Sequence, residues 1–311
     1  MKLGIVYAGQ GSQVVGMGKS FYDNYEIAKK IYDDIDLDID VKELSFNGPI
    51  EELSKTSQTQ PCMVAFGVVV TNLLKQNRII PSYVCGLSLG EYTALHASGV
   101  FDDQQAIELV RFRGLAMEKA AEGVKSKMLA IIGLDRTKLD EAVSKAKSLG
   151  VVQICNYNCP GQLVIGGEDK AVTKAGEYAL ELGARRAIPL NTSGPFHTSL
   201  LEEASKNLHD KFKDTKFNEM TIPVIFNATA KELADDKSIA DMLELQVKSS
   251  VYFEDSIRYM IDKGVDTIIE VGPGKVLSGF IRKIDKSIKT YQIEDNETFT
   301  KVLEELNNGS K

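Results

Sequence analysis

The sequence predicts an α/β fold in which a largely parallel sheet carries a smaller, inserted domain. Short apolar segments alternate with amphipathic helical segments along most of the chain, which is typical of a parallel sheet covered by helices on both faces. Between residues 125 and 191 the order becomes strand, helix, strand, strand, helix, strand, which is typical of a ferredoxin-like domain. A serine between two glycines, in the stretch GLSLG at 86–90, stands where a strand gives way to a helix.

The larger domain is expected to comprise residues 1–124 and 192–311, and the smaller one residues 125–191. In the larger domain the apolar runs predict strands at 3–8, 82–86, 222–227, 266–271 and 288–293. Its helices are predicted at 60–77, 89–99, 103–121, 198–213 and 236–249. Pro61 then lies in the first turn of its helix, a position that proline tolerates. The polar segment 36–59 is expected to form short helices and loops.

Composition excludes several classes of function. The 311 residues are 43% hydrophobic and 26% charged, with a net charge of −7, so nucleic acid is not an expected partner. The four cysteines lack metal-ligand spacing, and Cys62 and Cys85 are expected to be small buried side chains in a reducing compartment. The N-terminus enters a strand at once and has no long apolar segment, which predicts a cytoplasmic protein that does not bind membranes.

The stretch GLSLG matches the nucleophile elbow G-x-S-x-G. Its glycines permit a tight turn from which the Ser88 hydroxyl projects at the carboxyl edge of the sheet, and the following helix directs N–H groups at an oxyanion formed there. The alternative is a serine that only caps the helix, which would need no flanking glycines. The strand-to-helix context favours a catalytic nucleophile.

A serine nucleophile needs a base, and the chain has three histidines. His209 lies beside the apolar stripe of its helix and is expected at the surface, while His96 lies too far along the elbow helix to reach Ser88. His197 follows a strand and a Ser-Gly-Pro turn, so it is predicted on a loop at the carboxyl edge, where open α/β sheets carry their sites. No third acidic member of a triad is evident.

Two polar residues lie on inward helix faces. Arg113 continues the apolar stripe of its helix, whereas Arg111 lies about 200° away. A guanidinium on such a face requires a carboxylate or phosphate, either in a ligand or in an internal acidic residue. Gln246 likewise continues the stripe formed by Ile239 and Met242; a lone inward glutamine is usually a satisfied core amide.

Six motifs in order carry a resemblance to a known family: AGQGSQ at 8–13, GLSLGEY at 86–92, RFRG at 111–114, NYNCPGQLVIGG at 156–167, SGPFH at 193–197 and EVGPGKVL at 270–277. On these, the chain resembles the bacterial malonyl-CoA:acyl-carrier-protein transacylases, acyltransferases of fatty acid and polyketide synthesis. The resemblance spans essentially the whole chain. It implies an α/β-hydrolase-like large domain with a ferredoxin-like small one.

The resemblance also implies roles for residues of this chain. Ser88 would be the acylated nucleophile and His197 its general base and acid, with the N–H groups of Gln10 and Leu89 as the oxyanion hole. Arg113 would bind the malonyl carboxylate. Gln246 would orient His197 through its backbone carbonyl, which explains the missing acid. The remaining two predicted residues line the substrate pocket: Met117 and Phe196, the latter as in malonyl-selective acyltransferases.

The implied reaction moves a malonyl group from malonyl-CoA to the phosphopantetheine thiol of acyl carrier protein, with no metal or cofactor, in a monomer. The elbow departs from the commonest family form, because Leu87 replaces a histidine, and Ser250 stands where a proline is frequent. The alternatives are a stand-alone acyltransferase of a polyketide synthase and a serine esterase or thioesterase. A hydrolase requires neither Arg113 nor the inserted domain, so the presence of both favours acyl transfer over hydrolysis.

Carrier proteins are acidic, and this chain is acidic too. Docking must therefore use a local basic surface. The candidates cluster around the small domain: Lys119, Lys125, Lys127, Arg185 and Arg186.

Overall fold

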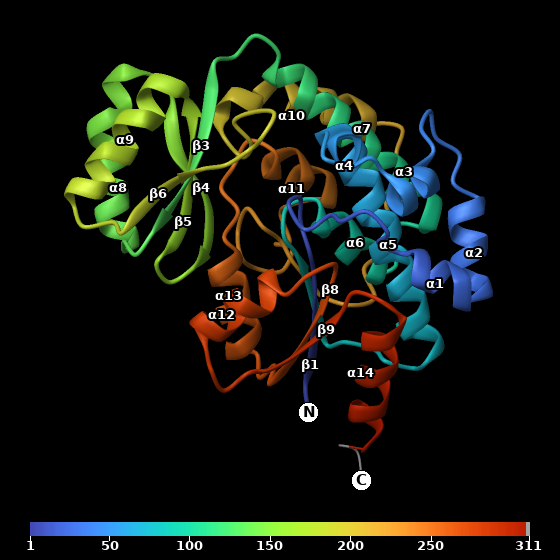
Figure 1. Ribbon diagram of the computed structural model, residues 1–311. Coiled ribbons are helices and arrows are strands. Elements are labelled where there is room, and N and C mark those ends of the chain that lie inside the picture. Colours follow the sequence, from blue (N-terminus) through green and yellow to red (C-terminus); the bar gives the residue numbers. More distant parts are fainter. Residues whose placement is uncertain (309–311) are drawn as a thin grey trace. The chain divides into compact units, whose positions relative to one another are not determined.

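The computed structural model describes residues 1–308, which fall into two compact units (Figure 1). The first contains residues 1–114, 217–226 and the chain from 259 onward; the second contains residues 115–216 and 227–258. The second unit therefore extends beyond the segment 125–191 expected for the small domain. One reason is pairing outside that segment, since Val251 forms a parallel bridge with Asn156.

The first unit is built on a five-stranded sheet in the order β7-β2-β1-β8-β9, and all its pairings are parallel. The strands are β1 Leu3–Tyr7, β2 Tyr83–Gly86, β7 Val224–Ile225, β8 Thr267–Val271 and β9 Lys289–Ile293. Strands β1 and β8 are buried along their whole length, as continuous apolar runs in parallel sheets require. The predicted parallel α/β sheet is confirmed.

Helices surround this sheet in the first unit: α1 Lys19–Asn24, α2 Glu26–Asp33, α3 Val41–Asn47, α4 Ile50–Leu53, α5 Thr56–Gln76, α6 Gly90–Ala97, α13 Val276–Ile284 and α14 Asn296–Asn308. Helices α7 Asp103–Ala121 and α12 Phe253–Asp262 contribute residues to both units. The short helices α3 and α4 and the loops around them confirm the expectation for residues 36–55, but residues 56–59 already belong to α5.

Helix α5 begins earlier than predicted, and Pro61 lies inside it rather than in its first turn. A proline there has no N–H for the carbonyl four residues before it, which is that of Ser57. This carbonyl instead accepts a 2.7 Å hydrogen bond from Arg111 Nη1. The polar residues that start the helix are thus buried by tertiary contacts, which is why composition alone put them in a loop.

The second unit contains a four-stranded antiparallel sheet in the order β4-β5-β3-β6. Its chain order is β3 Ser126–Ile132, α8 Arg136–Ala146, β4 Val152–Cys159, β5 Gln162–Glu168, α9 Asp169–Glu181 and β6 Arg186–Pro189. Helices α8 and α9 lie side by side on one face of this sheet (Figure 1), and their small apolar side chains share one core with it. Helices α10 Glu202–Phe212 and α11 Ile239–Gln246 complete the unit.

Candidate active site

The elbow is a sharp turn between β2 and α6. Ser88 has a left-handed backbone with φ of 55°, which is uncommon for a residue with a side chain and costs free energy. A Cβ atom on Gly86 would collide with the backbone of Gly90, and one on Gly90 with the carbonyl of Tyr7. Both flanking positions therefore require glycine, and the turn leaves the Ser88 side chain partly exposed.

The loop after β1 packs against this elbow. Leu87 N donates a 2.9 Å hydrogen bond to Tyr7 O, and a Cβ on Gly9 would lie 2.6 Å from Leu87 O. The next residue, Gln10, is anchored through its side chain, whose Nε2 donates to Thr56 Oγ1 over 3.0 Å. Leu89 is buried at the entry to α6. The two predicted oxyanion-hole residues thus follow adjacent parallel strands.

Arg113 is fully buried and faces the elbow serine. Its Nη2 donates a 2.9 Å hydrogen bond to Ser88 Oγ, and its Nη1 donates a 2.8 Å bond to Gln60 Oε1. The guanidinium also lies 5.8 Å from the centre of the Tyr92 ring. Burial lowers the pKa of Arg113, and the neighbouring Tyr92 and Glu91 partly offset that shift, but arginine remains charged at neutral pH.

Arg111 is buried as well, although its position about 200° from the inward stripe of α7 predicted that it would face outward. Its Nε and Nη2 form a fork with Asp38, at 2.9 and 2.7 Å, in addition to the bond to Ser57 O. These partners, Asp38 and Ser57, come from segments far away in sequence. They bury Arg111 on the face of α7 that the helical phase alone assigns to solvent. Arg111 is therefore structural, and it offers a natural comparison for Arg113.

His197 lies on a loop of the second unit and also has a left-handed backbone, with φ of 61°. It is 3% exposed, and its Nδ1 lies 2.9 Å from the backbone oxygen of Gln246 at the end of α11. A carbonyl can only accept, so this bond requires the proton on Nδ1 and leaves the lone pair on Nε2. An imidazole in this state can accept a proton at Nε2.

The predicted pocket residues are also buried. Met117 on α7 is 1% exposed, and Phe196, next to His197, is 7% exposed with its ring close to Gly194. Both belong to the second unit, together with His197 and Gln246. Ser88, Arg113, Gln10 and Leu89 belong to the first. Within each unit the structure brings together one polar pair, Ser88 with Arg113 and His197 with Gln246.

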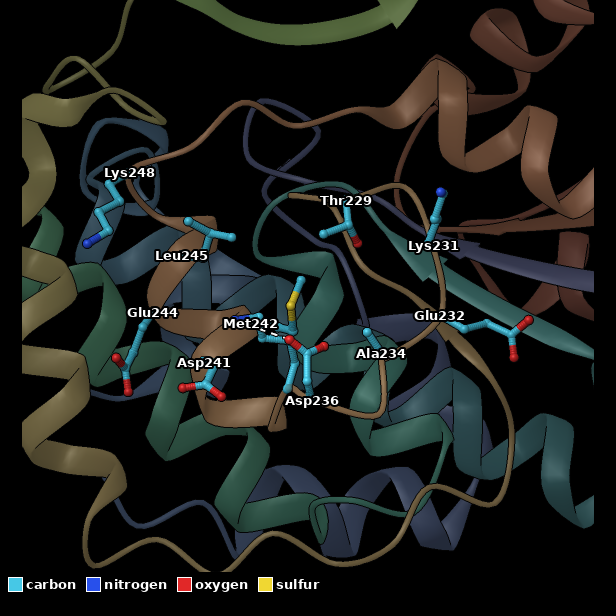
Figure 2. A pocket seen from close by; sticks show the side chains of 11 residues that line it. Thr229, Lys231, Glu232, Ala234, Asp236, Asp241, Met242, Glu244, Leu245 and Lys248 are labelled. Atoms are coloured by element: carbon cyan, nitrogen blue, oxygen red, sulfur yellow. Dashed lines mark ion pairs between the residues drawn. The ribbon is translucent and has the colours of Figure 1, made fainter.

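The second unit has a separate hollow of about 410 Å³, shown in Figure 2. Mixed charges line it, from Lys231 and Glu232 on one side to Asp241, Glu244 and Lys248 on α11 and just beyond. None of the predicted site residues lines it. The hollow is therefore no part of the predicted site.

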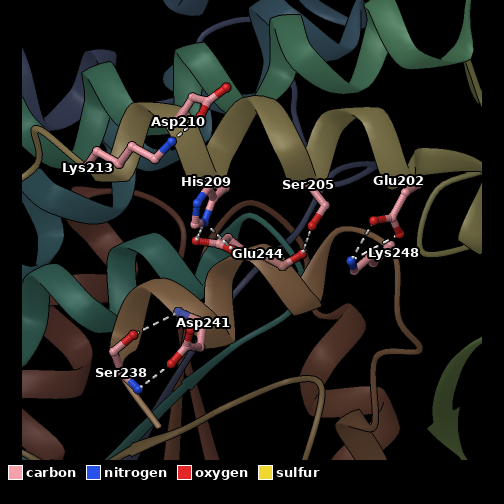
Figure 3. A network of polar contacts seen from close by, with 9 residues as sticks. All are labelled: Glu202, Ser205, His209, Asp210, Lys213, Ser238, Asp241, Glu244 and Lys248. Carbon is pink, nitrogen blue, oxygen red and sulfur yellow. Dashed lines mark hydrogen bonds and ion pairs between the residues drawn. The ribbon is translucent and has the colours of Figure 1, made fainter.

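The other two histidines have acidic partners. His96 is buried, and its Nε2 lies 2.7 Å from Asp103 Oδ1. His209 is exposed on α10 and pairs with Glu244 of α11 at 3.1 Å (Figure 3). Each ring therefore faces a carboxylate of its own unit.

Two further polar residues bind the predicted site residues, and the sequence did not predict them. Gln60 binds Arg113, and Gln153 of β4 binds the backbone on both sides of Thr198, through His197 O and Ser199 N. Gln60 stands directly before the long apolar run of α5, a position at which the sequence could have indicated a buried amide. Gln153 gave no such signal, because its partners are main-chain atoms 44 and 46 positions away.

Within residues 1–308, no group of three or more histidine, cysteine or acidic side chains is placed to hold a metal ion. All four cysteines are buried thiols. None of the helices in this range is both long and apolar enough to cross a bilayer.

Comparison with known proteins identifies the family. A family model described as acyl transferase domain matches residues 5–301. The malonyl CoA-acyl carrier protein transacylase of Bacillus subtilis (strain 168) is 39% identical over 308 residues, which cover 98% of this chain and 97% of that protein. The crystal structure of the malonyl CoA-acyl carrier protein transacylase from Clostridium perfringens matches with a TM-score of 0.95 at 40% identity, covering 100% of this chain and 98% of the other.

A third match is a solved type II PKS acyl-carrier protein in complex with its malonyl-transacylase. Its TM-score is 0.94 at 33% identity, and the match covers 98% of this chain and 100% of that one. The chain therefore belongs to the acyl transferase family and, within it, to the malonyl CoA-acyl carrier protein transacylases.

Proposed function

We propose that this protein transfers the malonyl group of malonyl-CoA to the phosphopantetheine thiol of an acyl carrier protein, through a malonyl ester on Ser88. The observation that carries the proposal is the hydrogen bond from fully buried Arg113 to Ser88 Oγ. A charge held beside the nucleophile suits an acyl group that ends in a carboxylate. The names of the relatives, malonyl CoA-acyl carrier protein transacylases, support the same substrate pair.

In the first half-reaction, His197 Nε2 accepts the Ser88 proton as Oγ attacks the malonyl thioester. The oxyanion of the tetrahedral intermediate accepts hydrogen bonds from the N–H groups of Gln10 and Leu89. His197 then protonates the departing CoA sulfur, and the malonyl ester of Ser88 remains. Gln246 keeps the imidazole in the required tautomer through its carbonyl, in the position that an acidic residue holds in a triad.

In the second half-reaction, the carrier-protein thiol loses its proton to His197 and attacks the ester carbonyl. The bond from the acyl carbon to Ser88 Oγ then breaks, and His197 returns the proton to Oγ. The kinetics are ping-pong because the acyl group waits on the enzyme. Arg113 pairs with the malonyl carboxylate in both halves. Acetyl groups are disfavoured because they would leave a buried guanidinium without its anion. Met117 and Phe196 form the apolar wall of the acyl pocket.

The proposed enzyme works as a cytoplasmic monomer and needs no bound cofactor. Residues 125–191 form a ferredoxin-like domain inserted in an α/β-hydrolase-like domain of residues 1–124 and 192–311, which the antiparallel strand order β4-β5-β3-β6 supports. The carrier protein docks on the basic side chains around that domain, of which Arg185 and Arg186 are exposed and Lys127 is paired with Asp169.

A second candidate differs only in pathway: a stand-alone acyltransferase that serves a polyketide synthase. The structural match to a malonyl-transacylase in complex with its type II PKS acyl-carrier protein supports this candidate. Parallel assays with carrier proteins of the two pathways distinguish them. The enzyme of fatty acid synthesis is expected to have the lower KM for the fatty-acid carrier.

Intact-mass spectrometry after mixing with malonyl-CoA tests the central claim. The wild-type protein should gain one malonyl group, and Ser88→Ala should gain none. His197→Ala should acylate far more slowly, and subsequent addition of holo carrier protein should discharge the wild-type ester onto its thiol. Malonylation of Ser88→Ala at the wild-type rate would refute the assignment, and rapid release as free malonate would indicate a thioesterase instead.

A further inference from the structure

The backbone of His197 needs external support. Its φ of 61° lies in the left-handed region, which costs a residue with a side chain about 1–3 kcal/mol unless its surroundings hold it there. A contact within the turn spans the histidine, from Thr198 Oγ1 to Pro195 O at 2.6 Å, and Thr198 Oγ1 also accepts a 3.3 Å bond from Leu200 N. A group on another element of the second unit binds the main chain on both sides of Thr198.

Gln153 is that group. From β4 its Nε2 donates a 3.1 Å hydrogen bond to His197 O, and its Oε1 accepts a 3.1 Å bond from Ser199 N. A carbonyl can only accept and an N–H can only donate, so the two partners define the orientation of the amide without ambiguity. One side chain thus clamps the main chain on both sides of Thr198.

The acceptor of the imidazole is fixed to the same strand by other contacts. Just after Gln246, the Ser250 hydroxyl donates to Ile154 O at 2.6 Å, and Val251 N donates to Cys155 O at 2.8 Å. Strand β4 therefore holds both ends of the His197–Gln246 hydrogen bond, one through the Gln153 side chain and the other through Ile154 and Cys155.

Helices α10 and α11 add a second support for the acceptor (Figure 3). Ser205 Oγ donates to Glu244 O at 2.8 Å, and Lys248 pairs with Glu202 at 3.0 Å. These contacts do not involve Gln153. Loss of the Gln153 amide should therefore move the histidine while its acceptor stays in place.

We propose that Gln153 is a positioning residue for His197: its amide holds the strained histidine backbone so that Nδ1 stays on the Gln246 carbonyl and Nε2 stays free to accept a proton. The inference rests on the proposed role of His197 as the base. Gln153 acts on the rate of proton transfer through the histidine and makes no contribution to holding the substrate.

The test compares Gln153→Met with Glu168→Met. Methionine keeps the length of either side chain and removes its polar end. Glu168 is a matched control because its Oε2 accepts from Val151 N at 2.6 Å, next to the start of β4, and it is no part of the site. Gln153→Met should lower kcat by about tenfold with KM for malonyl-CoA unchanged, as expected when a catalytic group is misplaced. Glu168→Met should keep the wild-type kcat.

Gln153→Glu provides a second variant in case methionine disturbs folding. Its carboxylate still accepts from Ser199 N but has no proton for His197 O, so the serine side of the clamp survives. It should lose as much kcat as Gln153→Met while melting at the wild-type temperature. A wild-type kcat in Gln153→Glu or Gln153→Met would overturn the proposal.

Nitrogen-15 NMR of the imidazoles gives a readout that a purely structural role would not move. The chain has three histidines, so the His197 signals can be assigned with single substitutions. Wild type should show protonated Nδ1 and unprotonated Nε2, and Gln153→Met should show a mixture of tautomers, with His96 and His209 unchanged. An unchanged His197 tautomer refutes positioning by Gln153. Full activity of His197→Ala would instead refute the proposed function, and the NMR result would still decide the role of Gln153.

Discussion

Arg113 Nη2 donates a 2.9 Å hydrogen bond to Ser88 Oγ from a side chain that has no exposed surface. The elbow hydroxyl and the buried cation are thus held against each other. Helix α7 supplies the arginine, α5 supplies its second partner Gln60, and the β2–α6 elbow supplies the serine. In the proposed function, this arrangement couples the choice of acyl group directly to the atom that is acylated.

Replacing Arg113 by alanine should remove selectivity for malonyl-CoA over acetyl-CoA. The malonyl carboxylate then has no cationic partner, and we expect kcat/KM for malonyl-CoA to fall about a hundredfold or more, with little loss for acetyl-CoA. Competition between the two thioesters, read by intact mass, measures the ratio. A malonyl preference that survives the substitution would contradict the role of Arg113.

Arg111→Ala is the matched control for this experiment. Arg111 is also buried on α7, but its partners are Asp38 and the Ser57 carbonyl. The substitution should lower the free energy of unfolding by about 2 kcal/mol and leave the acyl preference intact. A change of preference in both variants would point to a general disturbance of α7.

The elbow glycines should not tolerate a methyl group. Gly86→Ala would drive its Cβ into the backbone of Gly90, and we expect a loss of stability above about 4 kcal/mol or failure to fold. Gly279→Ala, inside α13 with open space around its Cβ, should instead gain about 0.5–1 kcal/mol. Urea unfolding measures both. Normal stability and activity of Gly86→Ala would refute the close approach.

An element of the fold could be predicted from the sequence where the hydrophobic or glycine pattern of its own residues specifies it. The buried strands β1, β2 and β8 are short apolar runs, and the elbow combines a strand, two glycines and a helix in one stretch. The start of α5 was missed because its polar first turn is buried only by contacts from distant segments.

At the site, too, local patterns were informative and contacts from distant segments were not. Helical phase alone placed Arg113 inward, because the stripe of α7 is local information. It failed for Arg111, whose partners Ser57 and Asp38 lie 54 and 73 residues away. Long-range contacts to main-chain atoms, such as those of Gln153, leave no pattern in the sequence at all.

Glu270 should prove essential for stability at the carboxyl edge of the first sheet. This buried residue of β8 accepts hydrogen bonds from Leu277 N at 2.9 Å and Ser278 N at 2.7 Å, at the start of α13. Glu270→Ala leaves both donors without their acceptor and should cost about 2–4 kcal/mol. The comparison variant is Glu294→Ala, which removes one acceptor from Gly274 N at an exposed turn and should cost less than about 1 kcal/mol. Equal losses in urea unfolding would argue against the special role of Glu270.

His96 should make the protein less stable in mild acid. Burial lowers the pKa of His96 from its usual value of 6.5, and the opposite charge of Asp103, together with that of Asp102, offsets only part of the shift, while Lys75 adds to it. The folded state therefore stays unprotonated at pH values where the unfolded chain already binds a proton. Stability should fall as the pH drops below about 6.5, by at most about 1.4 kcal/mol per pH unit from this group.

Urea unfolding of wild type and His96→Gln at about pH 7.5 and about pH 5.5 measures this contribution. The variant lacks the titrating group, so its stability should change less between the two pH values. His209→Gln serves as the control, because His209 is exposed and its removal should leave the wild-type pH dependence intact. If wild type and His96→Gln lose the same free energy between the two pH values, the buried histidine is not the source of the acid sensitivity.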